Sequence, residues 1–286
     1  MDDHEIEHIE IDLFLEGVYR RYGYDFRNYA RASVQRRMRR LMEMTGHKSA
    51  IAMLPDMLRD RTFLVKTVDA LSINVTEMFR DPLFFLTLRQ IVIPYLRTFP
   101  FIKVWHAGCS SGEEVYSLAI LFQEEGLYDR TTFFATDFNA NTLEKAKSGI
   151  YPLDSMRAFT ENYHVGGGKA SLSDYFLADH DNVIIRNSLK TNITFAMHNL
   201  ATDGVFGEMH LVLCRNVLIY FDRQLQSRVF RLFDDSLIHG GMLALGSKES
   251  LKFDEIAPRY ELIDAKWRLY KKLGHTSIDI LWGSPP

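Results

Sequence analysis

The residues best placed to do chemistry follow a short apolar run at 101–105. Gly108 and Gly112 bound a turn there, and Glu113 and Glu114 come directly after it. The turn has too few glycines for the dinucleotide fingerprint and lacks the lysine of a Walker motif. Two carboxylates in a first helical turn would repel a pyrophosphate, so they suit a cationic or hydroxyl-rich ligand better. The alternative is that these acids only complement the dipole of the helix.

A single acid, Asp137, ends the next run of β-forming residues at 131–137. An acid at this place can accept hydrogen bonds from ribose hydroxyls, as in NAD-type sites. It could instead cap a following helix, because Asn139 and Asn141 come just after it. The turn at Gly108 makes the ribose interpretation the better one. The sequence therefore favours a nucleoside cofactor without a pyrophosphate, and S-adenosylmethionine meets that description.

A third polar cluster follows the apolar run at 209–214. Arg215 and Asn216 come first, and Tyr220 stands four residues further on. Arginine and asparagine after an apolar strand, with an aromatic residue beyond them, are typical of the edge of a cleft. Taken alone, Tyr220 would more often be a core aromatic residue. The sequence His198-Asn199-Leu200 is a weaker version of the same layout.

Alternating strands and helices position these residues. Strands are predicted at 101–105, 131–137, 193–197, 209–214 and 241–246, and helices at 113–126, 139–148 and 223–238. Two more strands fit residues 260–273, with a turn near Asp264. This alternation predicts a parallel sheet in a doubly wound α/β fold, which binds ligands outside the carboxyl ends of its strands. A glycine run at 166–168 and an apolar alternation at 183–186 predict a small antiparallel β insertion at about 162–192.

The first part of the chain has a different pattern. Residues 1–16 hold seven acids and no Lys or Arg, and residues 20–40 then hold eight arginines against one acid. Val34, Met38 and Leu41 recur at helical spacing, so the arginines would cover the other faces of that helix. No strand pattern appears before residue 100. We therefore expect a small N-terminal helical domain over 1–85 and an α/β domain over 86–286.

Composition limits the classes of protein that the chain can belong to. The 286 residues include 34 Lys and Arg against 37 Asp and Glu, a net charge of −3 that argues against a dedicated nucleic-acid binder. Hydrophobic residues make up 47%, enough for a full core. No apolar run approaches about 18 residues and the N-terminus is acidic, so neither a transmembrane helix nor a secretory signal is predicted. Two cysteines, Cys109 and Cys214, can form neither a disulfide framework nor a four-ligand zinc site, and we expect a cytoplasmic protein.

Six stretches of the chain carry a resemblance to a known family. They are INVTEMFRD at 73–81, WHAGCSSGEEVYS at 105–117, ATD at 135–137, HNL at 198–200, CRNVLIYFD at 214–222 and LGSKESL at 245–251. In this order they resemble the CheR family, the chemotaxis methyltransferases that esterify receptor glutamates with S-adenosylmethionine. The resemblance covers roughly residues 20–270. It implies a Rossmann-like class I methyltransferase domain behind the helical domain.

The resemblance also implies roles for individual residues. The cofactor-binding residues would be Asn74, Thr76, Arg80, Gly108, Glu113, Asp137, Asn199, Leu200, Arg215 and Asn216. Asp137 would hold the ribose, Asn199 and Leu200 would bracket the adenine, and Arg215 and Asn216 would lie beside the methionyl part. Gly108 and Glu113 would approach the cofactor from the first loop.

The implied catalytic residues are Tyr220 and Arg80. Tyr220 would lie near the transferring methyl group. Asn74, Thr76 and Arg80 would contact the methionine end of the cofactor or line the cleft. No metal is predicted, because the ten histidines are scattered along the chain.

The resemblance further implies partners. The arginine-rich helix resembles the surface that contacts the methylated helices of chemoreceptors, and the β insertion resembles an element that docks receptor tails in some members. We expect a monomer that binds neither nucleic acid nor the membrane interior. Two alternatives stay open: a CheR-like enzyme acting on another signalling protein, and a non-catalytic module that senses S-adenosylmethionine.

Overall fold

The computed structural model describes residues 2–72, 76–205 and 207–274. The chain divides into two compact units. The helical unit comprises 1–74 together with 218–229, and the sheet unit comprises 75–217 and 230–286. The segment 218–229 therefore groups with the N-terminal helices, although it follows a strand of the sheet unit in the sequence.

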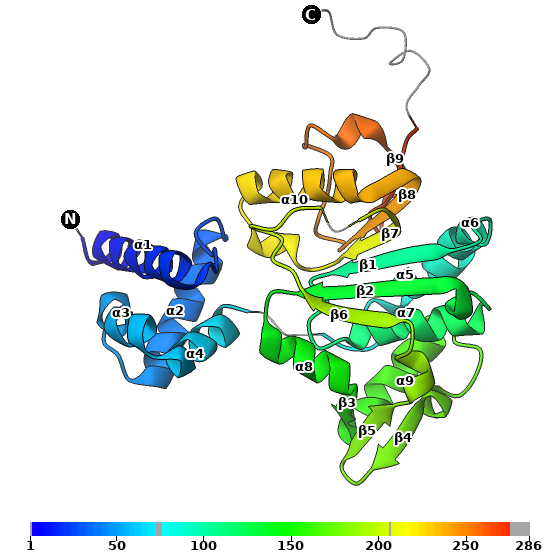
Figure 1. Ribbon diagram of the computed structural model, residues 1–286, viewed down its shortest axis with the longest axis horizontal. Coiled ribbons are helices and arrows are strands. Elements are labelled where there is room, and N and C mark those ends of the chain that lie inside the picture. Colours follow the sequence, from blue (N-terminus) through cyan, green and yellow to red (C-terminus); the bar gives the residue numbers. More distant parts are fainter. Residues whose placement is uncertain (1, 73–75, 206, 275–286) are drawn as a thin grey trace, which may run out of the picture. The chain divides into compact units, whose positions relative to one another are not determined.

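Four helices form most of the helical unit (Figure 1). They are α1 (Asp3–Tyr22), α2 (Arg31–Thr45), α3 (Ala50–Arg59) and α4 (Arg61–Leu71). Asp2 and Glu5 form a capping box at the start of α1, and Gly23 ends that helix in the left-handed conformation with φ 81°. Among the described residues no strand occurs before Ile102, as the sequence analysis predicted.

The core of the helical unit comes from regularly spaced apolar residues. Ile11, Phe14 and Val18 of α1 are fully buried. Val34, Met38 and Leu41 of α2 are buried too, as their spacing predicted. Burial of such side chains contributes about 1.5–3 kcal/mol each. These helices are thus held by packing and not by helix propensity alone.

The segment after residue 217 is fastened to the loop before α2. It contains the short turn η6 (Leu218–Tyr220) and the first part of α10 (Arg223–Ser236). Phe221 pairs with Tyr29 through an isolated antiparallel bridge, and their rings lie 4.9 Å apart. The N–H of Ala30 donates to the carbonyl oxygen of Tyr220 at 2.7 Å. Backbone pairing therefore fixes Tyr220 within the helical unit.

A seven-stranded sheet forms the centre of the sheet unit, in the order β6-β2-β1-β7-β8-β10-β9 (Figure 1). The strands are β1 (Ile102–Ala107), β2 (Thr131–Asp137), β6 (Ile193–Met197), β7 (Met209–Cys214), β8 (Leu237–Leu245), β9 (Tyr260–Asp264) and β10 (Leu269–Lys272). The first five of this order are parallel, and β10 and β9 add antiparallel pairs at one edge. The predicted doubly wound fold is confirmed.

The strand order creates a switch point between β1 and β7. The chain builds outward from β1 to β2 and β6 and then returns to place β7 on the other side of β1. Ligands of such sheets bind outside the carboxyl ends of the strands at this point. The loop after β1 and the loop after β7 are therefore the expected walls of a site.

The sheet unit also contains several helices. They are α5 (Pro82–Thr87), the π-turn η1 (Leu88–Val92), α6 (Ile93–Leu96), α7 (Glu113–Glu124), α8 (Ala140–Ser148) and α9 (Met156–Val165). Short 3-10 turns are η2 (Tyr128–Arg130), η3 (Leu153–Ser155), η4 (Leu172–Tyr175), η5 (Asn187–Leu189) and η7 (Ala257–Arg259). The main core packs α7 with α5 and the central strands, and Tyr116, Phe85 and Val104 are fully buried there.

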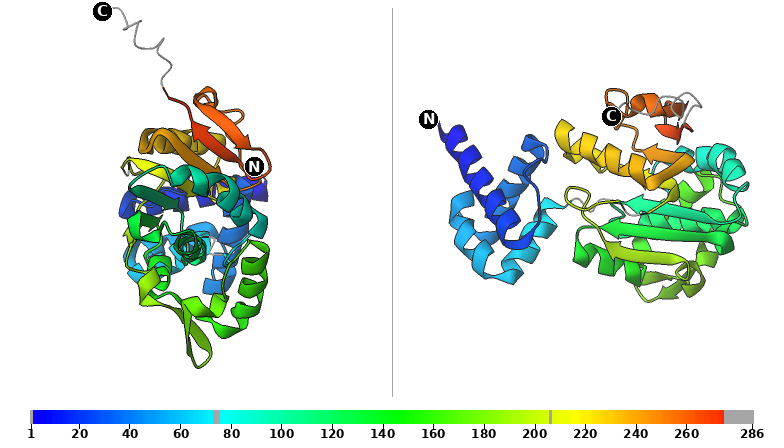
Figure 2. Two further views of the ribbon diagram at one scale, coloured as in Figure 1. Left: turned by 90° about the vertical axis from the view of Figure 1, so that its right-hand side faces the viewer. Right: turned by 45° about the horizontal axis from the view of Figure 1, so that its top comes forward.

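A small antiparallel sheet, β3-β5-β4, forms the predicted insertion. Its strands are β3 (Ile150–Pro152), β4 (Phe176–Asp179) and β5 (Asn182–Ile185), so it begins before residue 162 and encloses α9. Figure 2 shows the β4–β5 hairpin projecting from the sheet unit. A glycine is required at position 168, between α9 and β4, because a Cβ on Gly168 would lie 2.2 Å from the ring of Tyr163.

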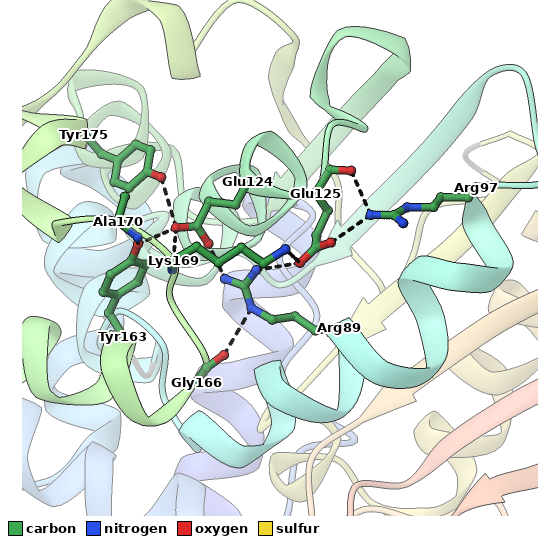
Figure 3. Close-up of polar contacts among 9 residues, drawn as sticks. All are labelled: Arg89, Arg97, Glu124, Glu125, Tyr163, Gly166, Lys169, Ala170 and Tyr175. Carbon is green, nitrogen blue, oxygen red and sulfur yellow. Dashed lines mark hydrogen bonds and ion pairs between the residues drawn. The ribbon is translucent and has the colours of Figure 1, made fainter.

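A buried charged network attaches this insertion to the end of α7 (Figure 3). Arg89 forms ion pairs with Glu124 and Glu125, and the Arg89 and Glu124 side chains are only 7% and 4% exposed. Glu124 also accepts hydrogen bonds from the hydroxyls of Tyr163 and Tyr175. Burial, together with the Glu124 carboxylate, raises the pKa of Tyr163 to about 12.

Two general features complete the fold. Cys109 and Cys214 are free and buried. No helix in the part of the chain that the structure describes is long and apolar enough to cross a membrane.

Candidate active site

The loops after β1 and β7 touch at a glycine. Gly108 has φ 78°, and a Cβ at this position would lie 2.7 Å from Cγ2 of Val217. The N–H groups of Gly108 and Cys109 both donate to the carbonyl oxygen of Thr136 at 2.9 Å. Only glycine allows this approach, because both the φ angle and the space exclude a side chain.

Asp137, at the end of β2, is the acceptor that joins these loops. The residue is 8% exposed, and its carboxylate accepts the N–H of Ser110 and the N–H of Asn139, both at 3.0 Å. Burial raises the pKa of Asp137, and these hydrogen bonds oppose that effect. An ionised carboxylate has about four lone-pair sites, so it can accept further hydroxyl donors.

The structure contradicts the interpretation of Asp137 as the cap of α8. Asn139 caps that helix, because its side chain accepts the N–H groups of Asn141 and Thr142. Asp137 therefore does not cap α8. The ribose interpretation of Asp137 stays a prediction, and it is consistent with the hydrogen bond from the Gly108 loop.

Ser110 brings a buried polar atom to the same loop. Its φ is 50°, and its Oγ is buried without a hydrogen-bond partner among the described residues. A buried hydroxyl without a partner costs about 1–3 kcal/mol. A polar group of a ligand lying along this loop would satisfy it.

The two adjacent acids of α7 have different environments. Glu113 is 8% exposed and accepts the Ser111 hydroxyl at 2.8 Å, and burial raises its pKa. Glu114 accepts a hydrogen bond from Nη1 of Arg215 at 2.5 Å. Burial opposes its ionisation, but the charge of Arg215 and the contact with His106 lower the pKa of Glu114 to about 2.

Arg215 is the centre of a charged cluster. Its side chain is 1% exposed, and Nη2 donates to Asp81 at 2.7 Å while Nη1 binds Glu114. Its guanidinium also lies 3.9 Å from the ring centroid of Phe84. The start of α5 and the first turn of α7 thus hold Arg215 through two carboxylates and one ring.

Strained backbone flanks Arg80. Phe79 and Asp81 have φ values of 52° and 56°, and such residues cost about 1–3 kcal/mol each. Phe79 is fully buried and its N–H donates to Oγ of Ser117 at 2.8 Å, and Asp81 is held by Arg215. The surroundings therefore impose this conformation on the turn that carries Arg80. Thr76 lies half-buried upstream, and Asn74 lies outside the described residues.

The loop after β6 meets the end of β2. The N–H of His198 donates to the carbonyl oxygen of Asp137 at 3.1 Å. The N–H of Asn199 donates to Asp203 at 2.9 Å, and Leu200 is 7% exposed. The loop that carries Asn199 and Leu200 therefore begins at the end of β2, and the role of these two residues at the adenine stays a prediction.

Tyr220 lies in the helical unit. Its ring is half-buried, and the guanidinium carbon of Arg37 lies 5.1 Å from the ring centroid. Burial lowers the pKa of Arg37. Tyr220 is thus not one of the fully buried core aromatics.

Two family models match almost the whole chain. One describes the CheR methyltransferase, S-adenosylmethionine-binding domain and matches residues 74–268. The other describes the CheR methyltransferase, all-alpha domain and matches residues 9–72. The chain belongs to the CheR methyltransferase family. The sheet unit of this CheR-family methyltransferase is a methyltransferase domain that binds S-adenosylmethionine.

Relatives in several bacteria share this assignment. A Pseudomonas putida protein named "Putative methyltransferase Cher3" is 48% identical over 264 residues, which covers 92% of this chain and 97% of the relative. A chemotaxis protein methyltransferase of Vibrio parahaemolyticus is 32% identical and covers 71% of this chain and 77% of its own length. A chemotaxis protein methyltransferase of Listeria innocua is 29% identical and covers 83% of this chain and 88% of its own length.

The residues of this CheR-family chain fit the cofactor. Asp137 has acceptor capacity left for ribose hydroxyls, Ser110 offers a buried hydroxyl, and Gly108 keeps the loop free of side chains. When bound, S-adenosylmethionine supplies a methyl group on a positively charged sulfur. In the described part of the chain no group of three His, Cys, Asp or Glu residues is arranged to hold a metal ion.

Sequence reasoning missed two contributors to this CheR site. Asp81 and Glu249 stand inside stretches that carried the resemblance, yet no role was assigned to either. Asp81 holds Arg215, and Glu249 accepts N–H groups of the loop after β7. The sequence showed an acid within each of these stretches, but it could not show which residue that acid contacts.

Proposed function

We propose that this methyltransferase transfers a methyl group from S-adenosylmethionine to side-chain carboxylates of glutamates in the helical cytoplasmic region of chemoreceptors. The products are glutamate methyl esters and S-adenosylhomocysteine. Membership of the CheR family supports the cofactor and the reaction class. The names of the Vibrio and Listeria relatives support a role in chemotaxis.

The observation that carries the receptor part of the proposal is a pair of exposed arginines on α2. Most arginines of residues 20–40 are used inside the helical unit. Arg39 binds Glu7 through two hydrogen bonds of 2.7 Å, Arg27 binds Glu16 at 2.9 Å, and Arg31 binds Asp12. These pairs neutralise much of the basic surface.

Arg36 and Arg40 differ from these. Both are exposed, and neither forms an ion pair with any residue that the structure describes. They are four positions apart and so share one face of α2. A helical receptor region that presents glutamates is acidic, and such a basic face would attract and orient it.

The chemistry fits a glutamate acceptor. A glutamate side chain has a reference pKa near 4.3 and is an anionic nucleophile at neutral pH, so no strong general base is required. The residues of the chain would align the carboxylate with the methyl and sulfur atoms and exclude water. Positioning of this kind contributes on the order of 7–11 kcal/mol. We assign Arg80 and Tyr220 to this alignment.

Labelled S-adenosylmethionine and purified receptor fragments test the proposal. The matched control fragment carries glutamine in place of the exposed glutamates of its helical region, and the matched control enzyme is Asp137→Ala. We expect label in the first fragment only, released by mild base as methanol. That result requires a carboxyl ester on glutamate.

Other outcomes would contradict the proposal in distinguishable ways. Base-stable label indicates another acceptor group. Label on a different signalling protein, with none on receptor fragments, indicates the first alternative function. Cofactor binding without methyl transfer to receptor fragments or to another signalling protein would indicate a sensing module.

A further inference from the structure

Glu249 follows β8 and has its carboxylate buried against the loop after β7. The residue is 4% exposed. Its Oε1 accepts the N–H of Val217 at 2.9 Å, and its Oε2 accepts the N–H of Asn216 at 3.1 Å and of Gly246 at 2.5 Å. Both oxygens are therefore used by backbone donors from two loops. Hydrogen bonds to a charged acceptor are about twice as strong as neutral ones.

The backbone that Glu249 holds is strained and close-packed. Asn216 has φ 61°, in the left-handed region that few residues other than glycine, asparagine and aspartate adopt. The next residue, Val217, places its side chain against Gly108, where a Cβ would lie only 2.7 Å away. A small rotation of this peptide would move both the Asn216 side chain and the surface that meets the Gly108 loop.

The loop after β8 is built around the carboxylate. A Cβ on Gly246 would lie 2.7 Å from Oε2 of Glu249 and 2.8 Å from the backbone nitrogen of Asn216. The N–H of Glu249 donates to the carbonyl oxygen of Gly246 at 2.9 Å, and this hydrogen bond closes the turn. Glycine thus leaves room for the carboxylate to reach the neighbouring loop.

We propose that Glu249 is a positioning residue for the cofactor site: its three backbone contacts hold Asn216 and Val217 against the Gly108 loop and so set the affinity for the cofactor. It acts through the backbone of the loop after β7 and need not touch the cofactor itself. Strained residues persist only where their surroundings over-determine them, and Glu249 supplies that constraint here. The proposal depends on cofactor binding and not on the identity of the methyl acceptor.

Calorimetry with S-adenosylhomocysteine tests it on Glu249→Gln. The amide keeps the shape of the side chain but turns an NH₂ group toward at least one backbone donor. We expect the protein to fold and its dissociation constant to rise about tenfold or more. The Michaelis constant for S-adenosylmethionine should rise more than kcat falls, and that for the methyl acceptor should stay unchanged.

Asp234→Asn is the matched control. Asp234 is another buried acid of the sheet unit, 3% exposed, and it holds Arg259 at 2.6 Å and Tyr260 at 3.0 Å on the far edge of the sheet. It should lower the melting temperature but leave the dissociation constant within about twofold. Equal effects of both variants on that constant, or no effect of Glu249→Gln, would overturn the proposal.

A second variant covers the case in which Glu249→Gln does not fold. Gly246→Ala keeps the carboxylate but crowds its contact with the loop, because the new Cβ would lie 2.7 Å from Oε2 of Glu249 and 2.8 Å from the backbone nitrogen of Asn216. It should weaken binding of S-adenosylhomocysteine in the same direction. Unchanged affinity in a folded Gly246→Ala protein would contradict a positioning role for Glu249.

Discussion

Arg215 and Glu114 are 101 positions apart in the chain, yet Nη1 of the arginine lies 2.5 Å from Oε2 of the glutamate. The contact joins the carboxyl end of β7 to the first turn of α7 at the switch point of the sheet. Because the Arg215 side chain is 1% exposed, its charge acts on Glu114 with little screening by water. We therefore expect this pair to make the stability of the fold depend on pH.

We expect Glu114→Gln to remove part of the acid sensitivity of the fold. The folded-state pKa is lowered from 4.5 to about 2, so the stabilisation is complete above pH 4.5 and is lost as the pH falls toward 2. It amounts to about 3 kcal/mol at neutral pH. Urea unfolding should give a free energy of unfolding that is clearly higher for the wild type than for the variant at pH 7. The two values should be close near pH 2. The exposed Glu144→Gln is the control, and parallel pH curves for wild type and Glu114→Gln would contradict the assignment.

Replacing Asp137 with Ala should weaken binding of S-adenosylmethionine and of S-adenosylhomocysteine. The change removes an acceptor for ribose hydroxyls, and a hydrogen bond to a charged group contributes about 1.5–3 kcal/mol. Calorimetry should show roughly tenfold or greater loss. Because Asp137 also accepts from Ser110 and Asn139, circular dichroism must confirm that the variant is folded. Unchanged affinity in a folded variant refutes the ribose assignment.

Tyr220→Phe should lower turnover more than cofactor affinity. The substitution leaves the ring near Arg37 and the backbone bond from Ala30, so it removes only the hydroxyl. That hydroxyl would orient the methyl group or the incoming carboxylate. Single-turnover kinetics alongside calorimetry separate the two effects. An equal fall in both, or no change in either, would instead indicate a packing role.

Reversing Arg36 and Arg40 to Glu should raise the Michaelis constant for receptor while cofactor binding stays intact. Their attraction acts through water, where the screening length is about 8–10 Å, so receptor affinity of the wild type should also fall as salt rises. Methylation assays at two salt concentrations measure both effects. Unchanged receptor methylation in the double variant would contradict the steering role.

The control for this prediction must avoid deleting residues 2–16. That deletion would remove Ile11, Phe14 and Leu15 from the core, so loss of activity would follow from unfolding. Glu7→Gln is cleaner, because it releases Arg39 without touching the core. If the arginines serve the receptor, receptor affinity should stay the same or improve in this variant.

Glu124→Leu should strongly destabilise the sheet unit. It removes one of the two buried carboxylates that pair with Arg89, and it removes the acceptor of the Tyr163 and Tyr175 hydroxyls (Figure 3). Breaking a buried pair on one side costs about 3–5 kcal/mol. Glu161→Leu, in the exposed pair with Arg157, should cost no more than about 1 kcal/mol. Urea unfolding compares the two, and similar losses would contradict the role of the network.

The sequence by itself determined the elements and the order in which polar residues follow them. Alternating strands and helices follow from local periodicity, which side-chain burial on one face imposes within a few residues. Asp137 and Arg215 could be placed at strand ends for the same reason. The helical spacing of Val34, Met38 and Leu41 was also sufficient to orient the basic faces of α2.

Only the tertiary structure decided which of these residues share a contact. Glu113 and Glu114 are neighbours in sequence, but burial raises the pKa of one while Arg215 lowers that of the other. The pairing of Tyr29 with Phe221 and the carboxylate of Glu249 against the loop after β7 could not be predicted either. Periodicity predicts which face of a helix or strand is buried. A contact between residues far apart in the chain depends instead on packing, on hydrogen-bond geometry and on local charge.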